Sequence, residues 1–157
     1  MIILGIDPGV ASTGYGLISK QGNQLSLITF GVIKTPAKTN FADRLNIIHR
    51  ELKALIKKYQ PNKIAIEELF FCKNVKTALM VGQARGVILL TSIQANIPIV
   101  EYTPLQIKQA VTSYGRAEKS QIQKMVKILL NLKNIPSPDD AADALATAIC
   151  ATQDITL

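Results

Sequence analysis

The sequence has few of the features that mark secreted or membrane proteins. Only two cysteines occur among its 157 residues, and two thiols without a secretory pattern indicate a reducing compartment rather than a disulfide-stabilised domain. The start, Met1–Asp7, has no basic region and reaches a charge at its seventh residue, so we expect no signal peptide. The apolar run Val87–Leu90 is far shorter than the ~20 residues that a membrane-spanning helix needs. We therefore expect a soluble, cytoplasmic protein with no membrane partner.

Acidic residues are also scarce. The chain has 11 Asp+Glu against 18 Lys+Arg, which gives a net charge of +7 and indicates a polyanionic partner such as DNA, RNA or an anionic membrane. The hydrophobic content of 48% is typical of a globular chain, and neither a linker nor a repeat interrupts it. We expect one domain over residues 1–157, long enough to bury a real core.

The order of predicted elements indicates an α/β fold. Helices are predicted at Phe41–Tyr59, Asn74–Asn96, Pro104–Tyr114, Glu118–Leu132 and from an N-cap at Ser137 onward. Strands are predicted at Ile2–Ile6, Thr13–Lys20, Gln24–Thr35, Ile64–Leu69 and Ile97–Tyr102. An antiparallel meander followed by βαβ-type crossovers gives a mixed five-stranded sheet with helices on both faces. This order matches the ribonuclease H-like fold.

Two acidic residues stand at the ends of apolar strands. Side chains alternate along a strand, so Asp7 shares a face with Gly5, and Glu67 shares a face with Ala65. If the two strands are neighbours, both carboxylates converge over small residues. Glu67 is preferred to Glu68 because it follows the buried stretch directly, although periodicity alone leaves that choice open. A carboxylate at the end of a buried strand is unfavourable unless it is paired or binds a ligand.

Two further acids begin an alanine-rich helix. Asp140 and Asp143 are three residues apart and therefore lie side by side on the helix. The alanines around them keep the helix slim, so it can pack closely against the sheet. The helix dipole is an alternative explanation, because it favours acidic residues such as Asp139 and Asp140 in a first turn whatever their function.

Gathered carboxylates repel one another, so such a cluster persists chiefly where it binds cations. Oxygen ligands without convergent His or Cys favour Mg²⁺ or Mn²⁺ over zinc. Two such ions can activate a water and stabilise the leaving oxygen of a phosphoryl displacement. Hard cations beside a basic protein surface point to chemistry on nucleic-acid phosphates.

Several short motifs carry a family resemblance. In chain order they are Gly5-Ile6-Asp7-Pro8-Gly9, Ala65-Ile66-Glu67, Gly82-Gln83-Ala84-Arg85-Gly86, Ala117-Glu118-Lys119-Ser120-Gln121 and Asp140-Ala141-Ala142-Asp143-Ala144-Leu145-Ala146. With these motifs the chain closely resembles the bacterial Holliday junction resolvases of the RuvC family, from Met1 to about Thr152. The first motif alone is weak, because sugar kinases and other actin-like ATPases also begin with it.

The resemblance implies a homodimeric endonuclease of ribonuclease H-like fold that nicks two opposed strands of a four-way DNA junction symmetrically. It implies two Mg²⁺ ions per active site, with Mn²⁺ as a substitute, and products with 5′-phosphate and 3′-hydroxyl ends. It also implies the branch-migration proteins RuvA and RuvB as partners. The family's catalytic and metal-binding roles fall on Asp7, Glu67, Asp140 and Asp143, all of which are acidic here.

The candidate DNA-binding residues lie between Glu67 and the last helix. The basic ones are Lys73, Lys76, Arg85, Lys108 and Lys119. The resemblance gives Lys108 and Lys119 phosphate contacts near the active site, whereas a solvated surface explains any single one of the others equally well. It also favours a base-stacking role for Phe70 at the branch point, for which core packing is the alternative.

Other function classes stay open at this point. An actin-like ATPase would share the Gly5–Thr13 turn, but it needs a second similar domain for which 157 residues leave no room. A non-catalytic nucleic-acid-binding module would keep the charge and the fold without the complete acidic set. A ribonuclease of the same fold would differ in its substrate.

Overall fold

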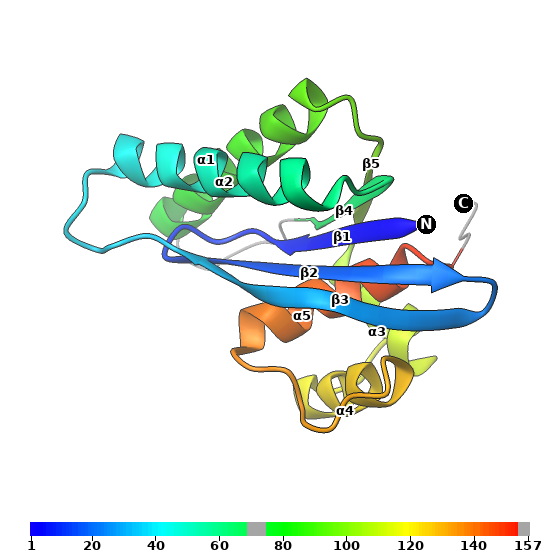
Figure 1. The fold of residues 1–157 in the computed structure, drawn as a ribbon. Coiled ribbons are helices and arrows are strands. Elements are labelled where there is room, and N and C mark those ends of the chain that lie inside the picture. Colours follow the sequence, from blue (N-terminus) through cyan, green and yellow to red (C-terminus); the bar gives the residue numbers. More distant parts are fainter. Residues whose placement is uncertain (69–74, 154–157) are drawn as a thin grey trace.

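The computed structural model describes residues 1–68 and 75–153 (Figure 1). Its sheet has the strand order β3-β2-β1-β4-β5. The strands are β1 (Ile2–Asp7), β2 (Ser12–Gln21), β3 (Gln24–Lys34), β4 (Lys63–Glu67) and β5 (Ile99–Tyr102). The first three pair antiparallel, and β4 and β5 continue the sheet in parallel with β1. The mixed five-stranded sheet predicted from the sequence is confirmed.

Helices cover both faces of this sheet. They are α1 (Phe41–Tyr59), α2 (Val75–Gln94), α3 (Pro104–Thr112), α4 (Lys119–Leu129) and α5 (Asp139–Cys150). In Figure 1, α1 and α2 lie on one side of the sheet and α3, α4 and α5 on the other. Helix α5 is the central one on its side, since it contacts β1, β2 and β4 as well as α3 and α4.

The alternation along β1 divides the interior into two cores. Leu4 and Ile6 pack toward α1 and α2, whereas Ile3 points to the opposite face and packs with α5. Register extends this division across the sheet, because Leu4 pairs with Leu17 and Ile3 pairs with Ile18. The face that carries Ile3 also carries Gly5 and Asp7. The core therefore directs the Asp7 side chain to the α5 side of the sheet.

The helix ends show where local chemistry decides a boundary. The sequence allows Thr39 or Asn40 as the N-cap of α1; it is Asn40, whose side-chain oxygen accepts a hydrogen bond from the Asp43 N–H at 2.9 Å. The prediction that helix α3 runs to Tyr114 is wrong by two residues. The helix ends instead where Ser113 adopts the left-handed conformation and donates its N–H to the Gln109 carbonyl. Helix α5 begins one residue later than predicted, with Pro138 as its N-cap.

In residues 1–68 and 75–153, none of the helices has both the length and the apolar character needed to span a bilayer.

Candidate active site

Asp7 is the last residue of β1, and its position follows from strand register. It pairs with Gly14 of β2, and the preceding pairs place Gly5 opposite Gly16 and Ile3 opposite Ile18. Directly opposed residues of an antiparallel pair point to the same face. The Asp7 side chain therefore lies on the face where Gly5, Gly14 and Gly16 meet α5.

Glu67 is the last residue of β4 and lies beside Asp7. The parallel register pairs Gly5 with Ala65 and Ile6 with Ile66, so the next step along both strands brings Asp7 alongside Glu67. Ala65 belongs to the core under α5, and Glu67 shares its face. Glu68, the alternative considered from the sequence, follows the end of β4 and donates its N–H to the Tyr102 carbonyl at 2.8 Å.

Helix α5 brings Asp140 and Asp143 to these two acids because glycines let it approach the sheet. A Cβ added to Gly14 would overlap the carbonyl oxygen of Asp140, and one added to Gly5 would overlap that of Ala144. The helix side of the contact is alanine-rich, and those alanines are buried. Close approach thus needs small residues on both partners, and the sequence supplies them.

Replacing Gly14 by alanine should test this packing. The added methyl meets backbone rather than a flexible side chain, so we expect overpacking of about 1–3 kcal/mol and a shifted first turn of α5. Thermal unfolding measures the loss. Gly31→Ala in β3 is the matched control, because its methyl would meet only the end of the Tyr15 side chain, which can move. Equal melting temperatures for the two variants would contradict the explanation.

Burial and neighbouring carboxylates raise the pKa of three of these acids, Asp7, Glu67 and Asp143. Burial, followed by the charges of Glu67, Asp143 and Asp140, raises the pKa of Asp7 from its ordinary value of 3.8 to about 8. Burial and then Asp143 raise the pKa of Glu67 to about 7, although Lys119 and Lys108 act in the opposite direction. The charges of the four acids therefore act on one another across β1, β4 and α5.

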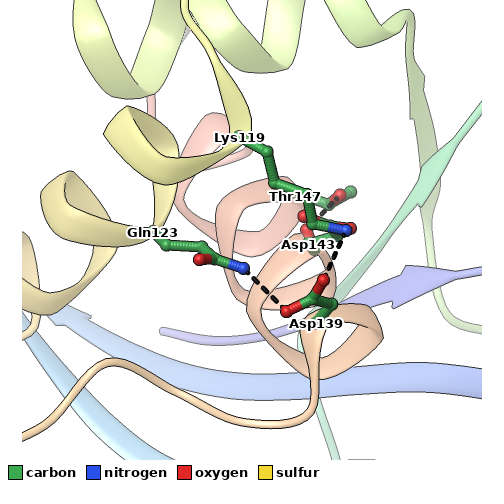
Figure 2. A network of polar contacts seen from close by, with 5 residues as sticks. All are labelled: Lys119, Gln123, Asp139, Asp143 and Thr147. Carbon is green, nitrogen blue, oxygen red and sulfur yellow. Dashed lines mark hydrogen bonds and ion pairs between the residues drawn. The ribbon is translucent and has the colours of Figure 1, made fainter.

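Lys119 provides a positive charge at the edge of this unit. Its Nζ lies 2.9 Å from Oδ2 of Asp143 and 3.3 Å from Oδ2 of Asp139, as Figure 2 shows. Burial raises the pKa of Asp143, and the hydrogen bond from Lys119 works against that rise. Lys119 is the first residue of α4, so this contact also joins α4 to α5.

A hollow of about 220 Å³ opens beside the acids. Carboxylates and ammonium groups from four separate elements meet on its wall. Its lining residues are Glu67, Pro104, Ile107, Lys108, Lys119, Ile122, Asp143 and Ala146. An anionic group in this hollow would contact two lysines while it faces two carboxylates.

The donor set fits a hard divalent cation in its chemistry, because it consists of carboxylates alone. Within the described ranges, no three His, Cys, Asp or Glu side chains stand close enough together to hold an ion as they are placed. One reason is visible: Lys119 engages the Asp143 carboxylate.

The other predicted binding residues are not all near the acids. Lys108 and Lys119 do lie near the acids, on the wall of the hollow. Arg85 lies on the α2 side of the sheet, where its guanidinium pairs with Glu101 of β5 at 2.7 Å. Lys76 is exposed in the first turn of α2. Phe70 and Lys73 lie outside the described residues.

Sequence reasoning missed two contributors to the site. Gly14 was read only as part of a strand, although its register opposite Asp7 would have indicated a small residue under α5. Asp139 was attributed to the helix dipole. Its contacts with α4 depend on how α4 and α5 pack, which no local pattern encodes.

Comparison with known proteins identifies the family. The family model described as Crossover junction endodeoxyribonuclease RuvC matches residues 3–151. A relative of that name from Halothermothrix orenii is 62% identical over 150 residues, covering 96% of this chain and 91% of the relative. The solved structure of Thermus thermophilus RuvC superimposes with a TM-score of 0.90 at 34% identity, covering 97% of this chain and 93% of the other.

A second Thermus thermophilus structure, of RuvC in complex with Holliday junction substrate, matches with a TM-score of 0.89 at 32% identity. It covers 97% of this chain and 93% of that one. The predicted ribonuclease H-like fold is confirmed by these likenesses. The chain belongs to the RuvC family of crossover junction endodeoxyribonucleases.

Proposed function

We propose that this chain is a metal-dependent endonuclease that resolves four-way (Holliday) DNA junctions by paired symmetric nicks, in homologous recombination and DNA repair. The observation that carries the proposal is the convergence of four carboxylates beside a lysine-lined hollow, in a chain of the RuvC family. All 157 residues would form a single nuclease domain that works in the bacterial cytoplasm.

The catalytic residues in this proposal are Asp7, Glu67, Asp140 and Asp143, which would hold two Mg²⁺ ions or Mn²⁺ in their place. Bound there, the ions supply Lewis acidity for hydrolysis of a phosphodiester bond. The raised pKa values of Asp7 and Glu67 support this assignment, because carboxylates that are buried beside like charges gain most from a shared cation. Each nick would leave a 5′-phosphate on one side of the break and a 3′-hydroxyl on the other.

Lys108 and Lys119 would hold the substrate phosphate. Both line the hollow that Glu67 and Asp143 also line, so a backbone phosphate could contact the ammonium groups next to the acids. Each neutralised phosphate releases counterions, so junction binding should weaken steeply as salt rises. The other binding residues, Phe70, Lys73, Lys76 and Arg85, stay predictions.

The test is a cleavage assay with labelled substrates. The wild-type protein should nick a four-way junction in Mg²⁺, bind it without cutting in Ca²⁺, and leave linear duplex and structured RNA intact at the same salt. Shifted complexes without nicked product in Mg²⁺ would favour the non-catalytic binding module. Preferential cutting of structured RNA would favour the ribonuclease.

A homodimer is part of the proposal, because a junction presents two equivalent strands and two-fold symmetry supplies one active site for each. Helix α2 offers a surface for it. Exposed positions recur along α2 at alternating four- and three-residue steps, the spacing of a helix–helix seam: Leu79, Gln83, Gly86, Leu90 and Ile93. RuvA and RuvB are the further partners that we propose from the family resemblance.

Leu90→Glu should split this dimer. The charge would be buried in the seam without a partner, so the molar mass measured by light scattering should fall to the 17.1 kDa of a monomer. The two nicks should then become uncoupled. Ile128→Glu is the matched control, since Ile128 is similarly exposed but lies on α4. An unchanged molar mass for the Leu90 variant would mean that the dimer interface does not lie on this face of α2.

A further inference from the structure

Lys119 is held by two carboxylates from successive turns of α5. Asp139 and Asp143 are four residues apart, and each places an Oδ2 atom within ion-pair distance of the same Nζ. The two acids differ in setting. The Asp139 side chain is 66% exposed and the Asp143 side chain 27%, so the ammonium lies between an outer and an inner partner.

Asp139 has a second contact that fixes its direction. Its Oδ1 accepts a hydrogen bond from Nε2 of Gln123 at 3.0 Å, while its Oδ2 faces Lys119 (Figure 2). Lys119 and Gln123 lie one turn apart on α4. Two neighbouring residues of α4 therefore engage the two oxygens of one carboxylate at the start of α5, which orients that carboxylate toward Lys119.

The pKa of Asp139 shifts in the opposite direction to those of the buried acids, although its charge is one of those that raise the pKa of Asp143. The charges that raise the pKa of Asp7 come from Glu67, Asp143 and Asp140. Hydrogen bonds from Lys119 and then Gln123 instead hold the pKa of Asp139 below its ordinary value. Asp139 is thus a partner of Lys119 and Gln123, and the three residues form a unit outside the four catalytic acids.

Lys119 needs Asp139 as a partner because its other partner, Asp143, is also a proposed metal ligand. If Asp143 binds a divalent cation, the ammonium must leave that oxygen, since two positive charges there repel each other. Lys119 is the first residue of a helix, where the positive end of the dipole disfavours an ammonium, so its place depends on the carboxylates around it: Asp139 and Asp143 in contact, and Glu67 and Asp7 through their charges. A lysine released to solvent would lose its place on the wall of the hollow.

We propose that Asp139 is a positioning residue that, oriented by Gln123, retains Lys119 beside the hollow when Asp143 turns to the metal ion. This proposal rests on the proposed nuclease function. It adds Asp139 and Gln123 to that function as residues that contact neither metal nor phosphate and act through Lys119.

The test begins with Mn²⁺ affinity in the absence of DNA, measured from the EPR signal of free Mn²⁺. In Asp139→Asn the ammonium keeps Asp143 as its one ion-pair contact within the described residues, so Mn²⁺ must displace it without the outer carboxylate to receive it. We expect affinity to fall about two- to fivefold, the range of one exposed ion pair. Gln123→Ala should act in the same direction, and Asp139→Glu should retain wild-type affinity.

A Lys119→Met background separates positioning from a simple charge effect. There, Asp139→Asn should change Mn²⁺ affinity by less than about 1.5-fold, because the residue through which Asp139 acts is gone. An equal loss in both backgrounds would mean that Asp139 attracts the metal directly, and no loss in either would mean that it has no role. Both results would overturn the proposal.

Cleavage supplies the second readout. At saturating junction and limiting Mg²⁺, Asp139→Asn should lower the single-turnover rate constant about two- to fivefold, with an unchanged dissociation constant for the junction. A rate equal to that of wild type would overturn the positioning role alone. A wild-type protein that binds Mn²⁺ but cuts no junction would overturn the proposed function, so the two failures are distinguishable.

Discussion

Asp7→Asn should abolish junction cleavage while leaving junction binding intact. The side chain keeps its size and loses one charge, so the fold and the lysine-lined hollow persist. Asp7 lies in the middle of the cluster, where Glu67, Asp143 and Asp140 all act on it. Loss of a residue that only supports a metal ligand lowers activity about 10–100-fold, so loss of a ligand itself should exceed that, on the order of 10³-fold.

The measurement is a single-turnover assay with a labelled four-way junction in Mg²⁺, together with a gel-shift assay in Ca²⁺. Glu51→Gln is the matched control, because it also removes one acidic charge, from an exposed pair with Arg50 on α1. The control should cleave at the wild-type rate. Cleavage by the Asp7 variant at that same rate would rule out its proposed role.

Much of the fold could be predicted from the sequence because two signals agree along the chain. The alternation in β1 separates Ile3 from Leu4, and the structure places these residues in different cores. The three- and four-residue spacing of α1 agrees with an N-cap at Asn40. The end of α3 could not be predicted, because the left-handed Ser113 has no distinctive residue type.

The acidic site was predictable for a related reason. Asp7 and Glu67 end neighbouring strands, and Asp140 and Asp143 share one helix face, so local periodicity places each side chain once the strand order is known. Contacts between a helix and another element have no such signal. Arg85 shows this limit, because its pairing with Glu101 depends on the packing of α2 over β5.

The metal-free protein should lose stability as pH rises from 4 to 8. A carboxyl group whose pKa is higher in the folded state than in the unfolded chain binds its proton more tightly when folded. Its contribution is fully present below the unfolded pKa, near 4, and is lost as pH rises through the folded pKa. Asp7, with a pKa of about 8, and Glu67, with a pKa of about 7, both act in this direction.

The size of the effect follows from the shift at Asp7. Each pKa unit corresponds to about 1.4 kcal/mol, which sets an upper limit of about 6 kcal/mol for a rise from 3.8 to about 8. Relaxation around a buried charge reduces this, and we expect about 3 kcal/mol. Asp7→Asn should therefore raise the melting temperature of the metal-free protein at pH 8 by about 10 °C and leave it nearly unchanged at pH 4.

The same experiment connects stability to function. At pH 8, Mg²⁺ should raise the melting temperature of the wild-type protein, because a cation stabilises the ionised carboxylates that burial disfavours. EDTA should reverse this rise. The melting temperature of the Asp7 variant should rise much less with Mg²⁺, since this variant already lacks the central negative charge. If the wild-type melting temperature were instead flat from pH 4 to pH 8 in EDTA, the four carboxylates would not repel one another in the folded protein, and the cluster would have no need of a metal ion.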